Sequence, residues 1–137
     1  MKLETMARQL NLLNLTPTVP LNHGAEIYGA HACELLSDVL ANAPPGTVLI
    51  TIQTHMNVLA VAARKNIRAI VFASGQMPTD EVIEKAAEKG IPLFSSKDST
   101  FDVAGQLYAF GLRETRGDEG YLLTGPSPVW GNQSGMS

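Results

Sequence analysis

Short apolar runs alternate with segments of helical periodicity along most of this chain, and this alternation limits the folds open to it. The runs at 47–52, 69–72 and 91–94 are bounded by turn-forming residues, as buried strands are. Segments 57–65 and 80–89, which separate them, carry apolar residues at the spacing of amphipathic helices. Because the connections are short, the pattern predicts an α/β fold with a mostly parallel sheet flanked by helices.

Local signals mark the ends of the helix expected at 80–89. Thr79 is suited to cap its first turn, because a threonine hydroxyl accepts a hydrogen bond from a free backbone N–H. Gly90 follows Lys89 and is a typical helix stop. Glu81 and Lys85 are four residues apart and are expected to pair on the exposed face.

Other elements follow from shorter patterns. A helix is expected at 3–10, a short strand at 26–32, and another strand at the start of 13–24. A helix is also expected over 33–42, and its predicted apolar face consists of Leu35, Leu36, Val39 and Leu40. In the last predicted helix, the side chains expected to face inward are Phe101, Ala104, Leu107 and Tyr108.

With 137 residues, the chain is long enough for one domain with a hydrophobic core. Residues 1–112 contain all of the predicted elements and form the expected domain. Residues 113–137 are rich in glycine, proline and serine and lack periodicity. They are expected to form a C-terminal tail that is either disordered or draped over the body.

Charge and cysteine content narrow the class of protein. The formal net charge is −3, and no basic stripe is present, so a nucleic-acid partner is not expected. The single cysteine, Cys33, excludes an internal disulfide and indicates a reduced compartment. The N-terminal segment resembles neither a signal peptide nor a membrane span, and we therefore expect a cytoplasmic protein without a membrane partner.

Two glycines, Gly24 and Gly29, have the spacing that opens a phosphate-binding P-loop. The residues that follow, Ala30 and His31, replace the lysine and the hydroxyl residue that such a loop needs to bind phosphate and magnesium. The glycines are therefore interpreted as positions where the backbone turns or packs closely.

Sequence spacing indicates no other catalytic constellation. There is no G-x-S-x-G elbow and no histidine or cysteine pair at metal-binding spacing, so catalytic residues, a metal and a cofactor are not expected. Ser74, His55 and Asp38 would make a triad on paper, but nothing in their spacing singles them out. Cys33 is interpreted as a small buried residue rather than a nucleophile.

Polar residues follow several of the predicted strands, where ligands of parallel α/β proteins bind. Small polar side chains and helix N-termini suit a phosphate or carboxylate. The predicted ligand-binding residues are His31, Gln53, Thr54, His55, Ser74, Gly75, Ser95 and Ser96. The competing interpretation is structural, because Thr54 and Ser96 can simply cap helices and His55 can bond a loop carbonyl. Glu34 and Asp38 are expected on one solvated helix face.

Three stretches together resemble the DRTGG domain family: ELLSDVLANA, ITIQTHMNVLAVAA and GIPLFSSKDSTFDVAGQLYAFG. The resemblance spans roughly residues 1–112, and its most specific parts are the QTH and SS segments. Members occur alone or fused to phosphotransacetylase and to pyrophosphatases with CBS domains, and they are similar to the N-terminal domain of HPr kinase/phosphorylase. The Asp-Arg-Thr-Gly-Gly sequence that names the family is absent here.

The resemblance implies a parallel α/β sandwich with a regulatory, non-catalytic role, often as a homodimer. A kinase label of the kind given to stand-alone members has no support here, since the P-loop of that kinase belongs to its other domain. We therefore expect a regulatory domain that senses a small anionic ligand, with a nucleotide as one candidate. The alternatives are an interaction module that binds a second copy or an unknown protein partner, and a phosphotransfer enzyme.

Overall fold

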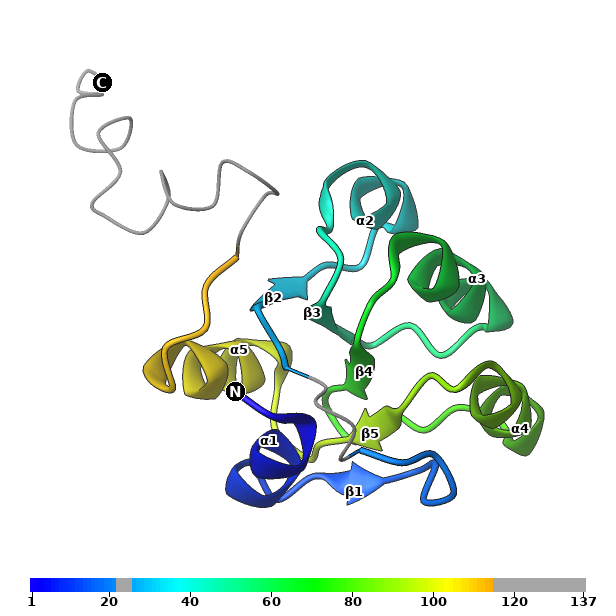
Figure 1. Cartoon of the computed structure of the whole chain (residues 1–137), viewed down its shortest axis with the longest axis horizontal. Coiled ribbons are helices and arrows are strands. Elements are labelled where there is room, and N and C mark those ends of the chain that lie inside the picture. Colours follow the sequence, from blue (N-terminus) through cyan, green and yellow to red (C-terminus); the bar gives the residue numbers. More distant parts are fainter. Residues whose placement is uncertain (22–25, 115–137) are drawn as a thin grey trace.

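The computed structural model describes residues 1–21 and 26–114, which form a single sheet covered by helices on both faces (Figure 1). The strands are β1 (Leu13–Asn14), β2 (Gly29–Ala32), β3 (Thr47–Thr51), β4 (Ala69–Phe72) and β5 (Leu93–Ser95). Their order in the sheet is β1-β5-β4-β3-β2. Strands β2 to β5 are parallel, and β1 pairs with β5 antiparallel. The predicted α/β fold with a mostly parallel sheet is confirmed.

The helices are α1 (Leu3–Gln9), α2 (Leu36–Asn42), α3 (Met56–Lys65), α4 (Asp80–Lys89) and α5 (Thr100–Ala109). Helices α2, α3 and α4 cover one face of the sheet, and α1 and α5 cover the other (Figure 1). From β2 to β5 the chain always moves to the next strand in the same direction. The parallel strands therefore contain no point at which the winding direction reverses.

The core consists of two layers that the strands separate. Alternating side chains of one strand enter opposite layers, as Val48 and Leu49 of β3 do. On the side of α2–α4, Phe72 of β4 packs among apolar residues of the helices, and on the side of α1 and α5, Phe94 of β5 does the same. All residues of β3 and β4 are buried, which explains why these strands are continuous apolar runs.

The helix ends agree with the local signals in the sequence. The Thr79 hydroxyl accepts a hydrogen bond from the backbone N–H of Val82, and Gly90 ends α4 in the left-handed conformation. Lys85, however, pairs with Glu88 at 3.6 Å rather than with Glu81 as expected. Both partners lie on the exposed face, where such a pair adds little to stability.

The prediction for 33–42 was partly wrong. Helix α2 begins only at Leu36, and its buried residue is Val39, whereas Leu35 and Leu40 are 64% and 39% exposed. The cause is Glu34, whose carboxylate accepts hydrogen bonds from the backbone N–H of Ile52 and from the Thr51 hydroxyl. These bonds hold Glu34 in the loop before the helix, so Glu34 and Asp38 do not share a helix face as expected.

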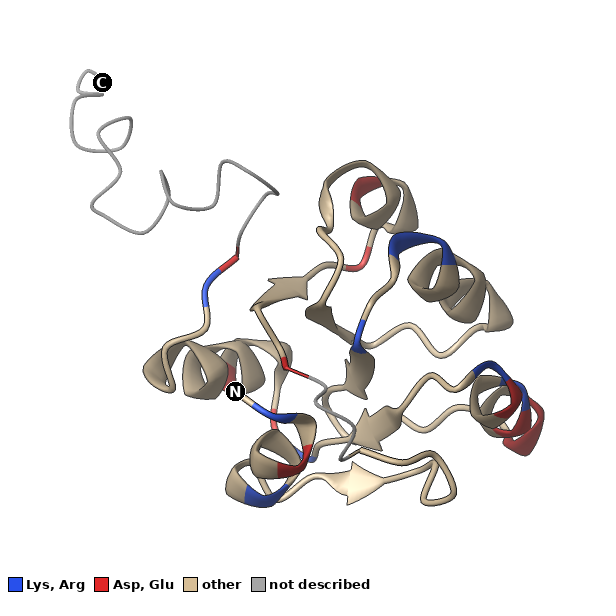
Figure 2. Ribbon diagram, in the orientation of Figure 1, with Lys and Arg blue, Asp and Glu red and all other residues tan. Residues whose placement is uncertain are grey.

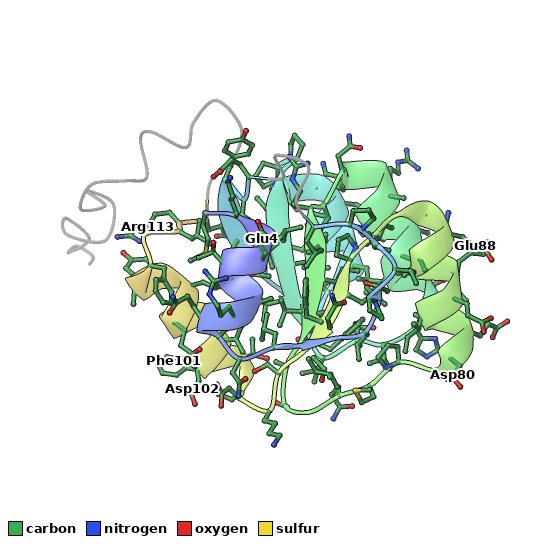
Figure 3. The ribbon with its side chains drawn as sticks, turned by 60° about the horizontal axis from the view of Figure 1, so that its bottom comes forward. Glu4, Asp80, Glu88, Phe101, Asp102 and Arg113 are labelled. Atoms are coloured by element: carbon green, nitrogen blue, oxygen red, sulfur yellow. The ribbon has the colours of Figure 1, made fainter. Side chains whose placement is uncertain are left out.

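The predicted inward face of α5 was also wrong in part. Val103 and Leu107 are fully buried, while Phe101 is 84% and Tyr108 60% exposed. Both pairs of residues fit a helical period, so spacing alone does not decide which pair faces the sheet. The guanidinium of Arg113 lies 3.6 Å from the centre of the Tyr108 ring and holds this ring at the surface. Figure 3 shows Phe101 and Arg113 on the outer side of the fold.

Charged residues lie on the helices and loops, and the strands carry none (Figure 2). Within 1–21 and 26–114, none of the helices has the length and apolar character needed to cross a membrane. Arg113 and Glu114, the first residues of the predicted tail, run along the outer edge of β2, where the Ala30 N–H donates to the Arg113 carbonyl. The rest of that tail, like Gly24, lies outside the described residues.

Candidate functional site

The carboxyl ends of β2, β3, β4 and β5 meet at one edge of the sheet, because these strands are parallel. The loops that leave β4 and β5 there are tied to each other through their backbones. The Ser74 N–H donates to the Asp98 carbonyl at 2.7 Å, and the Gly75 N–H donates to the Ser96 carbonyl at 2.7 Å. These two bonds fix the relative positions of the loops.

Beside these loops lies a hollow with a volume of about 330 Å³, which we call the β4–β5 hollow. It is bounded on one side by the turn between α1 and β1 and on the other by the two tied loops. The residues that line it are Leu10, Asn11, Leu13, Gly75, Met77, Ser95, Ser96, Lys97 and Asp98. Lys97 is the cationic side chain in this lining, and Asp98 is the anionic one.

The backbone around the β4–β5 hollow is held in an unusual conformation. Ser74 and Gly75 have φ angles of 58° and 68°, and Asn11 has a φ angle of 53°. The left-handed region costs a residue with a side chain about 1–2 kcal/mol, whereas glycine adopts it freely. Residues in this conformation occur at functional sites more often than elsewhere. The left-handed conformation of Ser74 therefore supports a functional role for this edge of the sheet.

The hydroxyls lining this hollow have roles in the loops themselves. The Ser95 hydroxyl donates to the Gln76 carbonyl, and the Ser96 hydroxyl accepts a hydrogen bond from the Asp98 N–H. The Asp98 carboxylate accepts a hydrogen bond from the side-chain amide of Gln106 at 2.9 Å. Since the Ser96 hydroxyl serves as an acceptor, its proton can still be donated to a ligand.

A second hollow, which we call the α3–α4 hollow, lies where these two helices begin. Its volume is about 270 Å³, and its lining consists of Thr54, His55, Met56, Thr79, Glu81 and Val82. His55 occupies the capping position of α3, but its side chain makes no capping hydrogen bond. The helix N-termini favour an anion here, whereas the Glu81 carboxylate opposes one.

Five of the eight predicted ligand-binding residues line one or the other of these two hollows. Gly75, Ser95 and Ser96 line the β4–β5 hollow, and Thr54 and His55 line the α3–α4 hollow. Gln53 and Ser74 stand on the adjoining loops. The Gln53 side-chain amide donates to the Glu34 carbonyl, so it ties the loop after β3 to the loop after β2.

His31 does not lie at the edge, where the sequence analysis placed it. It belongs to β2 itself and is 1% exposed. Its Nδ1 atom lies 2.6 Å from the Oε2 atom of Glu114. Nearby, the Cys33 thiol donates to the Asp38 carboxylate at 3.3 Å, and burial, followed by the Asp38 contact, raises the pKa of this thiol. Cys33 is half-buried, and its raised pKa makes it a weak nucleophile at neutral pH.

Sequence reasoning missed Lys97 and Asn11 in the β4–β5 hollow. Lys97 directly follows Ser95 and Ser96, so its place after a predicted strand was a usable signal. Asn11 gave a weaker one, because asparagine tolerates the left-handed conformation after a helix better than most residues. Nothing in the sequence indicated that the turn after α1 comes next to the loops after β4 and β5.

Fold and edge together define a small α/β domain with a mostly parallel sheet and two hollows near its carboxyl edge. The sequence model of the DRTGG domain family matches residues 25–110, more than half of the chain. The chain belongs to the DRTGG domain family, and the family prediction from the sequence is confirmed.

The fold is similar to that of a solved structure over most of this chain. It is the crystal structure of the CBS and DRTGG domains of the regulatory region of Clostridium perfringens pyrophosphatase, complexed with the activator diadenosine tetraphosphate. The TM-score is 0.58 at 14% sequence identity, and the match covers 85% of this chain. This chain corresponds to 51% of that chain, or about half its length. A comparison with curated proteins gave no match.

Proposed function

We propose that this chain is a non-catalytic regulatory domain that binds a small anionic ligand in the β4–β5 hollow. The observation that carries the proposal is the combination of a ligand-sized hollow with Lys97 at the carboxyl edge of a parallel sheet. A lysine ammonium binds phosphate or carboxylate as a point charge, and the Ser96 hydroxyl and the Asn11 amide add donors.

The size of the hollow narrows the class of ligand. About 330 Å³ is near the lower end of the range for small-molecule sites, which runs from about 300 to 1,000 Å³. A volume of this size suits a mononucleotide, an acyl phosphate or the end of a longer nucleotide. The DRTGG domain in the similar structure lies in a regulatory region, which supports a regulatory role. At 14% identity the similarity concerns the fold, and the preference for an anion rests on the residues of this chain.

The α3–α4 hollow is the weaker candidate for an anion. Its lining contains the Glu81 carboxylate and neither lysine nor arginine. In the β4–β5 hollow, the positive charge of Lys97 offsets the negative charge of Asp98, whose carboxylate already accepts a hydrogen bond from Gln106. This lining therefore opposes an anion less than the lining of the α3–α4 hollow does.

A thermal-shift screen of the purified full chain tests this proposal. The probes are ATP, ADP, AMP, diadenosine tetraphosphate, acetyl phosphate and inorganic phosphate. A ligand that binds only the folded state stabilises it by RT ln(1 + [L]/Kd), which is about 2.7 kcal/mol at one hundred times Kd. We expect a dose-dependent rise in Tm of several degrees with at least one of these anions.

Two variants identify the hollow that is used. Lys97→Ala should weaken binding of the stabilising anion about tenfold, because it removes one charge-assisted hydrogen bond. His55→Ala is the matched control in the α3–α4 hollow and should leave the affinity unchanged. The reverse result, with loss of binding in His55→Ala alone, would place the ligand in the α3–α4 hollow and contradict the proposal.

A second candidate function, an interaction module, is favoured by the apolar surface of α5 and the turn after it. Phe101 is 84%, Tyr108 60% and Phe110 48% exposed, which is unusual for aromatic side chains of one helix and its end. Such a surface suits a second copy of this chain or an apolar protein partner. A screen without any shift, together with a solution mass twice that of the chain, would favour this function.

A further inference from the structure

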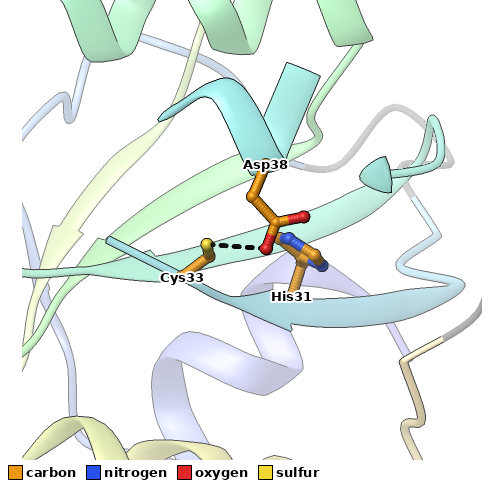
Figure 4. A group of neighbouring side chains, drawn as sticks. All are labelled: His31, Cys33 and Asp38. Atoms are coloured by element: carbon orange, nitrogen blue, oxygen red, sulfur yellow. Dashed lines mark hydrogen bonds between the residues drawn. The ribbon is translucent and has the colours of Figure 1, made fainter. Parts of the chain in front are cut away.

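A cluster of metal-ligating side chains lies apart from both hollows, between β2 and α2. His31 and Cys33 are two residues apart along β2 and its end, so their side chains point to the same face of the sheet. Asp38, in the first turn of α2, lies over them (Figure 4). Ligand atoms of His31, Cys33 and Asp38 all lie within 4.8 Å of one another.

The buried imidazole of His31 supports a ligand at this cluster independently of the spacing of its side chains. Its side chain is 1% exposed, and neither ring nitrogen makes a hydrogen bond of acceptable geometry with the residues that the structure describes. The Glu114 carboxylate forms an ion-pair contact with Nδ1 at 2.6 Å, so Nε2 is the ring nitrogen that has neither a hydrogen bond nor an ion pair among the described residues. A buried polar atom without a partner costs about 1–3 kcal/mol, so the buried Nε2 atom of His31 calls for an explanation.

We propose that His31, Cys33 and Asp38 bind a divalent transition-metal ion, for which Zn²⁺ is the best fit. A thiolate, an imidazole and a carboxylate are the three side-chain types that bind zinc in proteins. Zinc is about 2.3 Å from sulfur and about 2.0–2.2 Å from oxygen, so tetrahedral neighbours lie about 3.5 Å apart. The Cys33 sulfur is 3.3 Å from the Asp38 carboxylate, which is close to this spacing.

Glu114 adds a second carboxylate beside the same imidazole. In zinc sites a carboxylate in this place is either a further ligand or the group that orients the histidine ring. The local charges also favour a cation, because Cys33 lies beside the Asp38 carboxylate and adjacent to Glu34 in the sequence. A divalent cation would offset this negative charge and would bind the lone pair of a buried imidazole nitrogen.

The test uses the full chain without an affinity tag, freed of metal by a chelator that is then removed. Zn²⁺ alone is titrated in competition with a chromogenic chelator, and Co²⁺ is used as a spectroscopic substitute. We expect one equivalent of Zn²⁺ per chain, and a thiolate-to-cobalt absorption band that identifies sulfur as a ligand. Cys33→Ser should abolish the band and lower the Zn²⁺ affinity about 100-fold or more.

A matched pair of histidine variants completes the test. His31→Gln should lose tight Zn²⁺ binding, whereas His55→Gln, which changes an exposed histidine, should retain it. Circular dichroism checks that each variant is folded. If His31→Gln does not fold, the result for Cys33→Ser decides the test. Folded chain that binds no Zn²⁺, or Zn²⁺ binding that survives both Cys33→Ser and His31→Gln, would overturn the proposal. Anion binding in the β4–β5 hollow is unaffected by either result.

Discussion

Replacing Phe72 with alanine should lower the free energy of unfolding by about 3–5 kcal/mol. Phe72 is the last residue of the central strand β4, is 0% exposed, and packs against the layer formed by α2, α3 and α4. Its truncation removes apolar contacts and leaves a cavity that the surrounding side chains fill only in part. Domains of this size have about 5–15 kcal/mol of stability, so this single change removes a large share.

The measurement is equilibrium unfolding in urea, followed by circular dichroism, with Phe101→Ala as the matched control. Phe101 is 84% exposed, so the same substitution there should change the stability by no more than about 0.5 kcal/mol. The pair also tests the orientation of α5, for which helical spacing alone predicted an inward Phe101. Equal losses in the two variants would contradict the packing described above.

Gly46→Ala should lower the free energy of unfolding by about 1–3 kcal/mol. Gly46 has a φ angle of 82°, in the region that residues with a Cβ atom rarely adopt. An added Cβ would also lie 2.7 Å from the Cδ2 atom of Tyr28, so the Tyr28 ring would have to move. The Gly46 N–H donates to the Asn66 carbonyl, and the Gly46 carbonyl accepts a hydrogen bond from the Tyr28 N–H. The turn at Gly46 therefore connects the end of α3 to the segment before β2.

Gly105→Ala is the control with the opposite expected sign. Gly105 lies inside α5, where an added Cβ would have no heavy atom within 4 Å. Alanine there should raise the stability by about 0.5–1 kcal/mol, because glycine loses more backbone freedom in a helix. Thermal unfolding of both variants gives the comparison. A loss in Gly105→Ala as large as that in Gly46→Ala would show that the special backbone of Gly46 is not the cause.

The buried strands were predictable because composition alone is enough for them. Residues 47–51 and 69–72 are covered on both faces and form unbroken apolar runs. The cap at Thr79 and the stop at Gly90 were predictable for a similar reason, since both depend on neighbouring residues only. Elements whose ends depend on residues far away in the sequence could not be predicted in this way. The start of α2, for example, depends on bonds between Glu34 and the end of β3.

The arrangement of the site depends on the strand order, which periodicity does not determine. The sequence placed polar residues after each strand and predicted one continuous ligand-binding edge. In the structure the chain winds in one direction from β2 to β5, so the parallel strands leave no crevice of the kind formed where the winding reverses. The two hollows lie instead beside α1 and beside the starts of α3 and α4.

The cluster around His31 could not be predicted either, because it depends on how distant segments are arranged in space. In the sequence, His31 and Cys33 have no metal-binding spacing with another histidine or cysteine, and no metal was expected. Their common side of β2 follows from strand geometry, but the position of Asp38 over them depends on where α2 begins. The approach of Glu114 depends on how the chain returns along the edge of β2 after α5.

The central claim is that an anionic ligand binds in the β4–β5 hollow, and amide chemical shifts test it most directly. Protein labelled with ¹⁵N is titrated with ATP, or with the strongest stabiliser from the thermal screen. We predict saturable shifts that are largest at Asn11, Gly75, Ser96 and Lys97, which are the glycine and three of the polar residues of that lining. Saturable shifts centred on His55 and Glu81, or no saturable shift with any of the probes, would contradict the account.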